Sequence, residues 1–349
     1  MSLPDKILIV CFGAVGDITR ALPLVARIKK ASPQTKIHWA VEPRSRSIIE
    51  NHPNIDCIHE FFRPGGLLVF IRFLRELRRE KFNLVLDLQR HFKSGLTTFA
   101  TGSSRRIAFN RKNSREFNWV FANEWISVQE HFTSKVFHYQ AFGDKLDLPK
   151  ENKLDFGFCA TDNSKEKVTK LIMQNGPKES SKLVGLILGS TWPSRFWIDD
   201  YYVRLIKELS SRWGVTAILI GGGVREEIFA KGICDKVNQD SVINLVNKTT
   251  LADLISVFQS VGCAIGSDSG PMHIAAGAGT PVISLWGSTS PKRSSPYGSE
   301  DLVISSVIGC SPCYKANCLG LNTLCMRDIT PDAVLALYAK LLDNQRLVN

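Results

Sequence analysis

The fold is decided by the stretch Lys6-Ile-Leu-Ile-Val-Cys-Phe12-Gly13-Ala-Val-Gly16-Asp17. Its continuous apolar run, Lys6 to Phe12, predicts a parallel strand that is buried on both faces. Two glycines follow, and apolar residues then recur at helical spacing, which predicts a helix over Ile18 to Lys30. A strand, a glycine turn and a helix in this order open a βαβ unit.

The same alternation continues outward along both halves of the chain. Strands are expected at Ile37–Val41, Asn83–Asp87, Leu183–Leu188, Val215–Ile220, Val242–Leu245, Cys263–Gly266 and Pro281–Trp286. Helices are expected between them, among them Leu67–Glu80, Asp199–Trp213 and Met272–Ala278. This pattern predicts an α/β protein of two doubly wound parallel-sheet domains, with the ligand at the carboxyl ends of the strands in the cleft between them.

The domain limits follow from changes in composition. We expect an N-terminal domain over 1–165 and a C-terminal domain over 180–330, with a hinge between Lys150 and Lys182 that includes the turn-rich stretch Asn175–Lys182. A last helix begins at Pro331 behind Thr330, a plausible N-cap.

Composition excludes several classes of protein. With 349 residues, 44% hydrophobic and 22% charged, the chain is neither disordered nor fibrous. No apolar run approaches the ~20 residues of a membrane span, and Pro4 and Asp5 do not suit a signal peptide. The formal charge of +11 indicates anionic partners: nucleic acid, anionic lipid or phosphorylated small molecules. Its densest runs, Arg72–Lys81 and Arg105–Arg115, match no RNA-binding signature with interleaved aromatics, so nucleic acid is the weaker reading.

The first glycine turn has the spacing G-x-x-G, which disfavours a dinucleotide-binding dehydrogenase. Asp17 would repel a phosphate at the following helix, so this turn is expected to face a hydroxyl or a sugar. Asp17 is then either a helix cap or a general base. Another strand ends in a polar segment with Asp87, Gln89, Lys93 and Ser94. These residues either line the part of the site that binds the molecule accepting a transferred group or form a solvated helix start.

Three strand ends in the second half carry polar residues suited to a nucleotide. Ser190, Thr191 and Arg195 either hold a diphosphate or belong to an ordinary loop. Gly266 to His273 predicts a phosphate cradle at a helix N-terminus. Asp268 and His273 each have a second interpretation without a ligand: Asp268 could cap the helix, and His273 could be a buried imidazole with a structural role. Gly221-Gly222-Gly223 either passes close to a ribose or makes a tight turn.

Four of the nine cysteines crowd together near the C-terminus: Cys310, Cys313, Cys318 and Cys325. They could supply four thiolates to a structural zinc. Their spacing matches neither a paired CxxC ribbon nor a ferredoxin run, so reduced thiols that simply pack are the alternative.

Taken together, these segments resemble glycosyltransferase family 9, the ADP-heptose:lipopolysaccharide heptosyltransferases. The resemblance is carried by Gly16-Asp17-Ile-Thr-Arg-Ala-Leu-Pro23, Asp87-Leu-Gln89 with Lys93-Ser94, Ser190-Thr-Trp-Pro-Ser-Arg195-Phe-Trp197, and Asp268-Ser-Gly-Pro-Met-His273 with Gly287-Ser-Thr289-Ser-Pro291. The cysteine cluster with Ile329-Thr-Pro331 looks like the tail of one branch of the family.

The resemblance implies a GT-B fold, in which two Rossmann-like domains face a cleft and the helix at 331–349 crosses back to the first domain. It implies an inverting, metal-independent transfer of heptose from ADP-heptose to Kdo or heptose in the lipopolysaccharide core. Asp17 takes the position of the catalytic base. The donor-binding residues are then Ser190, Thr191, Arg195, Gly222, Asp268, Ser269, Gly270 and His273, and the acceptor-binding residues are Gly16, Gln89 and Lys93.

Two positions depart from the family pattern. Arg195 stands where lysine is more usual, and Val224 stands where some members carry a ribose-binding Glu, with Glu226 and Glu227 nearby. The alternatives are a GT-B transferase or epimerase acting on another nucleotide sugar, a nucleotide-binding protein without catalysis, and a nucleic-acid binder. The resemblance implies that catalysis requires no cofactor and that the protein binds no nucleic acid. The basic runs would dock a cytoplasmic enzyme on the anionic inner face of the membrane, beside its lipid A-core acceptor.

Overall fold

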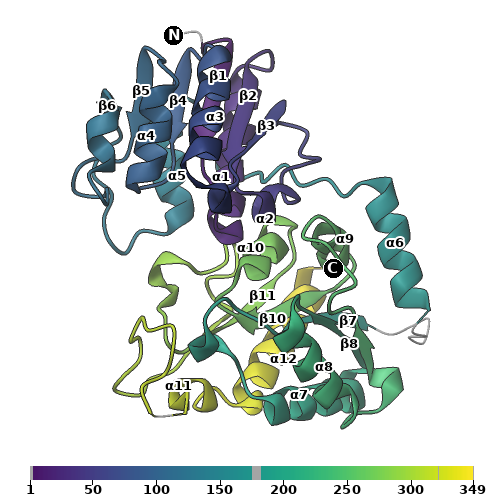
Figure 1. Cartoon of the computed structure of the whole chain (residues 1–349). Coiled ribbons are helices and arrows are strands. Elements are labelled where there is room, and N and C mark those ends of the chain that lie inside the picture. The colour runs from purple at the N-terminus through teal and green to yellow at the C-terminus, as the bar shows by residue number, and fades with distance from the viewer. Residues whose placement is uncertain (1–2, 175–181, 321, 349) are drawn as a thin grey trace. The chain divides into compact units, whose positions relative to one another are not determined.

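The computed structural model describes residues 3–174, 182–320 and 322–348. The chain divides into two compact units, Met1–Cys159 and Ala160–Asn349. Both are layered α/β units, coloured purple to teal and teal to yellow in Figure 1. Within the described residues, no helix is both long enough and apolar enough to cross a membrane.

The N-terminal unit is built on a six-stranded parallel sheet in the order β3-β2-β1-β4-β5-β6. Its strands are β1 (Lys6–Val10), β2 (Lys36–Val41), β3 (Cys57–Glu60), β4 (Leu84–Asp87), β5 (Arg105–Ala108) and β6 (Glu124–Trp125). Its helices are α1 (Val15–Ala31), α2 (Pro43–Arg46), α3 (Gly66–Arg79), α4 (Phe92–Ala100) and α5 (Lys135–Lys145), with short 3₁₀ turns at Arg63–Gly65 and Asn118–Phe121.

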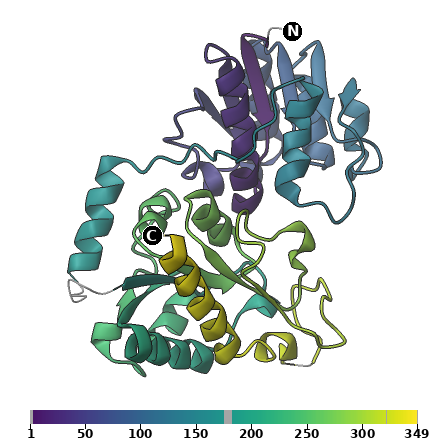
Figure 2. The ribbon, with the colours of Figure 1, turned by 180° about the vertical axis from the view of Figure 1, so that it is seen from behind.

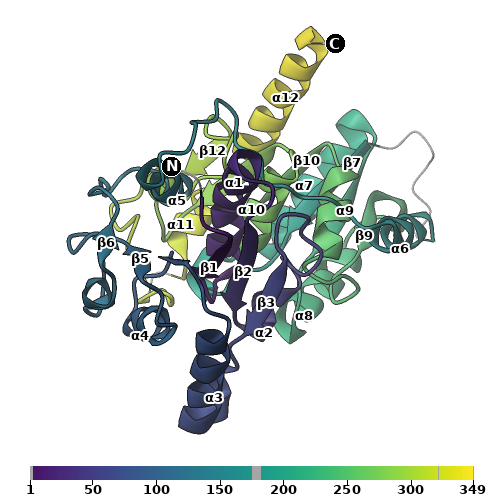
Figure 3. The same ribbon diagram turned by 90° about the horizontal axis from the view of Figure 1, so that it is seen from above.

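The helices of this unit cover both faces of its sheet. Figure 3 shows α3 and α4 on one side of the strands and α1 and α5 on the other. Beneath α3, Phe73 and Leu77 pack on Leu8, Val10 and the neighbouring apolar residues of the sheet. Burial of β1 from both sides explains why its sequence is a continuous apolar run rather than an alternating one.

The C-terminal unit repeats the plan in the order β12-β11-β10-β7-β8-β9, again wholly parallel. Its strands are β7 (Lys182–Ile187), β8 (Val215–Ile220), β9 (Val242–Asn244), β10 (Cys263–Ser267), β11 (Val282–Trp286) and β12 (Val303–Ser305). Its helices are α6 (Asp162–Met173), α7 (Asp199–Trp213), α8 (Val224–Cys234), α9 (Asp253–Gln259), α10 (Gly270–Gly277), α11 (Leu324–Arg327) and α12 (Pro331–Val348). Short 3₁₀ turns lie at Pro193–Arg195, Gln239–Ser241 and Pro291–Arg293.

Helix α12 packs in the C-terminal unit against α7 and β11 (Figure 2). Val334, Leu335 and Tyr338 are buried in the same apolar core as α7. The predicted return of residues 331–349 to the N-terminal domain, and the predicted domain limits, stay predictions.

The expected doubly wound α/β class is confirmed, and both sheets have the strand order of a Rossmann fold. The bounds predicted for α7 agree with the structure, whereas β3, β5, β6, β12, α4 and α5 were not predicted. These missed strands are two to four residues long, too short to show a periodic pattern. Of the predicted turn-rich stretch, residues 175–181 lie outside the described residues.

In each sheet the order of strands reverses at one point, between β1 and β4 and between β7 and β10. Ligands of doubly wound sheets bind where the loops leave the carboxyl ends of these central strands. The polar segments singled out from the sequence follow β1, β4, β7 and β10. The topology therefore places them at the two positions best suited to ligand binding.

Candidate functional site

In the C-terminal unit, β10 ends in a turn that starts α10. Ser269 is the N-cap residue and Gly270 the first helical residue, so backbone N–H groups at this helix start are available to an anion. Gly266 lets β10 approach β7 closely, because a Cβ there would come within 2.7 Å of Ile187 Cβ. The predicted succession of strand, turn and helix start is therefore present, and its role as a phosphate cradle stays a prediction.

The loop after β7 brings Ser190 and Arg195 to this turn. The Ser190 hydroxyl donates to the carbonyl of Asp268 at 2.8 Å, and Arg195 Nη1 donates to the same carbonyl at 3.1 Å. Arg195 Nη1 also pairs with Asp268 Oδ2 at 3.2 Å, while Thr289 Oγ1 donates to that oxygen at 2.9 Å. Asp268 therefore does not cap α10; it fixes the guanidinium of Arg195 at the cradle.

Two polar atoms of this cluster are buried without a protein partner: Arg195 Nε and Ser269 Oγ. A buried donor without a hydrogen bond is costly, and such groups are rare in folded proteins. Both atoms belong to side chains that the sequence assigns to a diphosphate. A ligand with several acceptor oxygens would satisfy them.

The remaining predicted donor residues surround this cluster or the neighbouring strand end. His273 is buried in the first turn of α10, Thr191 is exposed, and Gly222 is exposed with open space at its Cα. Val224 is exposed, but the Glu226 side chain packs over Gly189, where an added Cβ would collide with it. Of the acidic residues near the Gly-rich turn, Glu226 is thus the one directed at the end of β7.

In the N-terminal unit, Asp17 lies in the first turn of α1. The N-cap residue of this helix is Ala14, so Asp17 is not the capping residue. Its carboxylate pairs with Arg20 Nη2 at 2.6 Å and with Lys135 Nζ, from α5, at 3.2 Å. Burial raises the pKa of Asp17, but Lys135 and Arg20 more than offset this and hold the pKa well below its usual range. The carboxylate is therefore ionised at any physiological pH.

The other predicted acceptor residues adjoin the same turn. Gln89 Nε2 donates to the carbonyl of Gly13 at 2.6 Å, which ties the end of β4 to the glycine loop. Gly16 is buried within α1, and Lys93 is exposed in the first turn of α4, with its Nζ 6.0 Å from the ring centre of Phe61. The structure thus brings Gln89 to the loop, whereas the contact of Lys93 is with an aromatic ring.

Asp87 has a structural role at this end of the sheet. It accepts hydrogen bonds from the Asn118 amide at 2.7 Å and from the Gln89 N–H at 3.0 Å. Burial raises its pKa to about 7 despite these donors. Asp87 therefore organises the residues after β4 rather than facing a ligand.

Three residues of these contacts were given no role from the sequence: Lys135, and Arg20 and Thr289, which lie in segments that carry the family resemblance. The i, i+3 spacing of Asp17 and Arg20 on a predicted helix was a readable signal for that ion pair. Lys135 is 118 residues from Asp17, and no local pattern connects the two.

The four clustered cysteines are free thiols, from exposed Cys310 to buried Cys325. Burial raises the pKa of Cys325, and the nearby thiols of Cys310, Cys313 and Cys318 raise it further. Within the described ranges, no three of these sulfurs lie within 4.8 Å of one another. The hypothesis of a structural zinc stays a prediction.

Comparison with known proteins gives consistent matches across the chain. Residues 70–323 match the model of a family described as glycosyltransferase family 9 (heptosyltransferase). The chain is 25% identical to the lipopolysaccharide core heptosyltransferase OpsX of Haemophilus influenzae over 86% of its own length and 84% of the relative's. It is 27% identical to lipopolysaccharide heptosyltransferase 1 of Campylobacter coli over 82% and 85% of the two chains.

Solved structures share the fold. A glycosyl transferase of family 9 from Veillonella parvula superposes with a TM-score of 0.83 at 18% identity, covering 99% of each chain. The heptosyltransferase WaaC of E. coli, solved with ADP, gives a TM-score of 0.76 at 20% identity over 96% and 99% of the two chains. At these identities the likeness establishes the architecture alone.

Proposed function

The chain belongs to glycosyltransferase family 9, and we propose that it transfers heptose from ADP-heptose to Kdo or heptose in the inner core of lipopolysaccharide. The proposal rests on the curated relatives, which are named as lipopolysaccharide core heptosyltransferases. The observation that carries it is the pair of buried, unpartnered atoms, Arg195 Nε and Ser269 Oγ, at the start of α10. A diphosphate supplies the acceptor oxygens that these two donors lack.

The reaction follows from charge. Asp17 accepts the proton of the acceptor hydroxyl, whose oxygen attacks the anomeric carbon while the bond to the diphosphate breaks. The departing ADP takes the electron pair, and Arg195, Ser269 and the N–H groups at Gly270 stabilise its negative charge. One displacement inverts the anomeric centre and needs no second catalytic carboxylate. These cationic and dipolar groups supply the stabilisation without a catalytic metal.

The ion pairs of Asp17 lower the basicity of its carboxylate, so the mechanism requires that acceptor binding weaken them. A carboxylate held by Arg20 and Lys135 is ionised but weakly basic, because both cations favour its charged form. An anionic group on the acceptor that pairs with Lys135 would draw this cation away and raise the basicity of Asp17. Binding of the correct acceptor and activation of the base are then the same event.

The acceptor side also carries a surface suited to a membrane. Leu67 and Leu68, at the start of α3, are 71% and 82% exposed, and Phe62, just before the preceding turn, is 53% exposed. The arginines of the run Arg72–Lys81 follow on the same helix. We propose that the leucines enter the anionic cytoplasmic face of the membrane and that each well-placed arginine adds about 1 kcal/mol.

Vesicle co-sedimentation tests this docking. A Leu67→Ser, Leu68→Ser variant should lose binding to anionic vesicles, whereas Val307→Ser, which changes an 89% exposed valine of the other unit, should not. Binding that depends on neither anionic lipid nor salt would contradict the proposal.

The activity itself is tested with ADP-heptose and a panel of truncated lipid-linked cores, followed by mass spectrometry. We expect a gain of one heptose on a single acceptor of the panel, together with release of ADP. Turnover of the nucleotide sugar without any acceptor would instead indicate an epimerase. Transfer only from other nucleotide sugars would show that the donor has been misassigned.

A further inference from the structure

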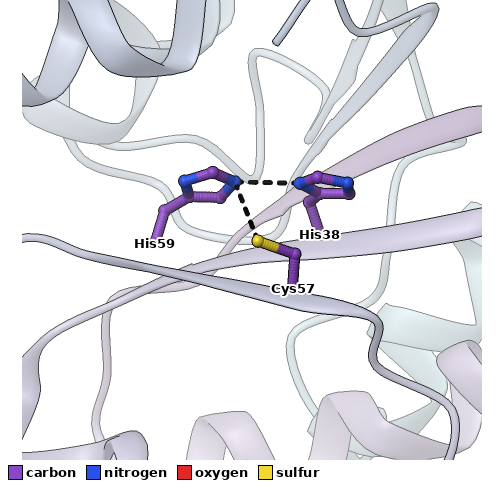
Figure 4. A group of neighbouring side chains, drawn as sticks. All are labelled: His38, Cys57 and His59. Carbon is purple, nitrogen blue, oxygen red and sulfur yellow. Dashed lines mark hydrogen bonds between the residues drawn. The ribbon is translucent and has the colours of Figure 1, made fainter.

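A cluster of three potential metal ligands lies in the N-terminal unit, on strands that the proposed function does not use. His38 on β2 is the register partner of Cys57 on β3, and His59 follows two residues later on the same face of β3. His38 Nδ1 lies 2.9 Å from His59 Nε2, and Cys57 Sγ lies 3.8 Å from that same nitrogen. Figure 4 shows the three side chains converging on one point.

The geometry is close to that of a bound transition metal. Metal–nitrogen bonds of about 2.0–2.1 Å and a metal–sulfur bond of about 2.3 Å place tetrahedral ligand atoms roughly 3.3–3.6 Å apart. The two observed separations, 2.9 and 3.8 Å, differ from these values by a few tenths of an ångström. All three ligand atoms lie within 4.8 Å of one another. Small side-chain rotations would therefore admit an ion.

A carboxylate orients one of the ligands from behind. Glu76 Oε1 on α3 lies 3.1 Å from His59 Nδ1, which fixes the proton on Nδ1 and leaves the lone pair of Nε2 directed at His38 and Cys57. A carboxylate bonded to the remote nitrogen of a ligating imidazole is the usual support of a metal site. The imidazoles are buried and the thiol is half-buried, so an ion can enter at the thiol.

Nearby charges do not oppose a cation. Lys6 lies close to this cluster, but its ammonium is paired with Glu80. Glu76 adds one further negative charge, and the thiolate of Cys57 would add another. The site therefore offers negative charge in excess of positive charge once the thiol is deprotonated.

We propose that His38, Cys57 and His59 bind a zinc ion, with water or an exogenous ligand in the fourth position. Two imidazole nitrogens and one thiolate suit zinc and exclude the oxygen-seeking Mg²⁺ and Ca²⁺. On binding, the Cys57 thiol releases its proton to solvent. The hydrogen bond between the imidazoles is replaced by two metal–nitrogen bonds, as the proton of His38 Nδ1 moves to Nε2 by exchange with water.

The position of the site suggests what the ion does. β3 is the edge strand of the sheet and pairs with β2 alone. An ion held by both strands, and supported through Glu76 by α3, would clamp this edge to the helix above it. The site is separate from the four-cysteine cluster, which lies in the other unit.

Alkylation of the reduced, metal-free full chain tests the proposal one residue at a time. Two equivalents of Zn²⁺, enough for this site and for the four-cysteine cluster, should slow the iodoacetamide labelling of Cys57 at least tenfold, as measured by peptide mass spectrometry. Cys234, another half-buried thiol, is the internal control and should label at the same rate with and without Zn²⁺. Equal labelling of Cys57 in both conditions overturns the proposal.

Variants and a spectroscopic probe complete the test. His59→Gln should abolish the protection of Cys57, and Glu76→Gln should weaken Zn²⁺ binding by about 10–100-fold. Titration with Co²⁺ should give a thiolate-to-cobalt absorption band. The number of Co²⁺ equivalents that saturates this band should fall by one in Cys57→Ala and stay unchanged in Cys234→Ala. A Co²⁺ stoichiometry and spectrum that are unchanged in Cys57→Ala would refute the site, even if that variant is less stable.

Discussion

Replacing Asp17 with asparagine separates its catalytic role from its structural one. The change removes the negative charge but keeps an acceptor oxygen for Arg20 and Lys135. The proposed base accounts for a factor of about 10²–10⁴ in rate, which corresponds to roughly 3–5 kcal/mol of transition-state stabilisation. Donor binding should be unchanged, because the predicted donor residues all belong to the other unit.

The free energy of unfolding that Asp17→Asn is expected to lose is much smaller than this loss of transition-state stabilisation. Asp17 is 29% exposed and Arg20 9% exposed, so their contact at 2.6 Å is a partly buried charged hydrogen bond. The amide oxygen still accepts from charged donors, so the bond stays within the about 1.5–3 kcal/mol of a hydrogen bond to a charged group, and moving from the upper to the lower part of that range costs roughly 1 kcal/mol. The variant should therefore fold, and any large loss of rate reflects chemistry.

The assay is single-turnover transfer from saturating ADP-heptose, with ADP-heptose affinity measured by calorimetry and folding by urea denaturation. Asp144→Asn is the matched control, because Asp144 also pairs with a buried arginine, Arg27, at 2.8 Å. It should lose a similar amount of stability and keep its rate. Transfer by Asp17→Asn within threefold of wild type would refute the assignment of the base.

Three further predictions concern Arg195, Asp87 and Lys135. Arg195→Ala should raise the Kd for ADP-heptose about 10–100-fold in calorimetry, since it removes hydrogen bonds to a charged group, while the exposed Arg212→Ala should leave the Kd unchanged. Burial raises the pKa of Asp87 from 3.8 to about 7, so the folded protein holds this proton where the unfolded chain has lost it. Asp87 then contributes stability at low pH that is lost as pH rises from about 4 to about 7. Urea denaturation at a series of pH values measures the free energy of unfolding, and in Asp87→Asn its fall between pH 4 and pH 7 should be smaller than in wild type. The same fall in both proteins would contradict the assignment. Lys135→Met should raise the pKa of Asp17 and move the acid limb of the pH–rate profile to higher pH; an unmoved limb would show that Lys135 does not tune the base.

Much of the turn between β10 and α10 could be predicted because each part of it is local. Ser269 and Gly270 follow directly from a strand, a small-residue turn and a helix read in order. The contact of Arg195 with Asp268 was not predictable, because 73 residues separate them and adjacent strands β7 and β10 bring them together. For Asp17 the structure excludes the cap alternative, because Ala14 is the cap residue, while its role as the general base stays a prediction.

The sequence by itself determined that this protein is two doubly wound α/β units, because apolar runs, glycine turns and helical periodicity are local properties of the chain. It also determined which polar segments follow the central strands. Only the tertiary structure decided which polar side chains meet: Asp17 with Lys135, Arg195 with Asp268, and His38 with Cys57 and His59. Apart from Cys57 and His59, which lie two residues apart on β3, these partners come from different helices, strands or loops of the chain. Strand pairing and helix packing set their distances, which no local pattern of residues encodes.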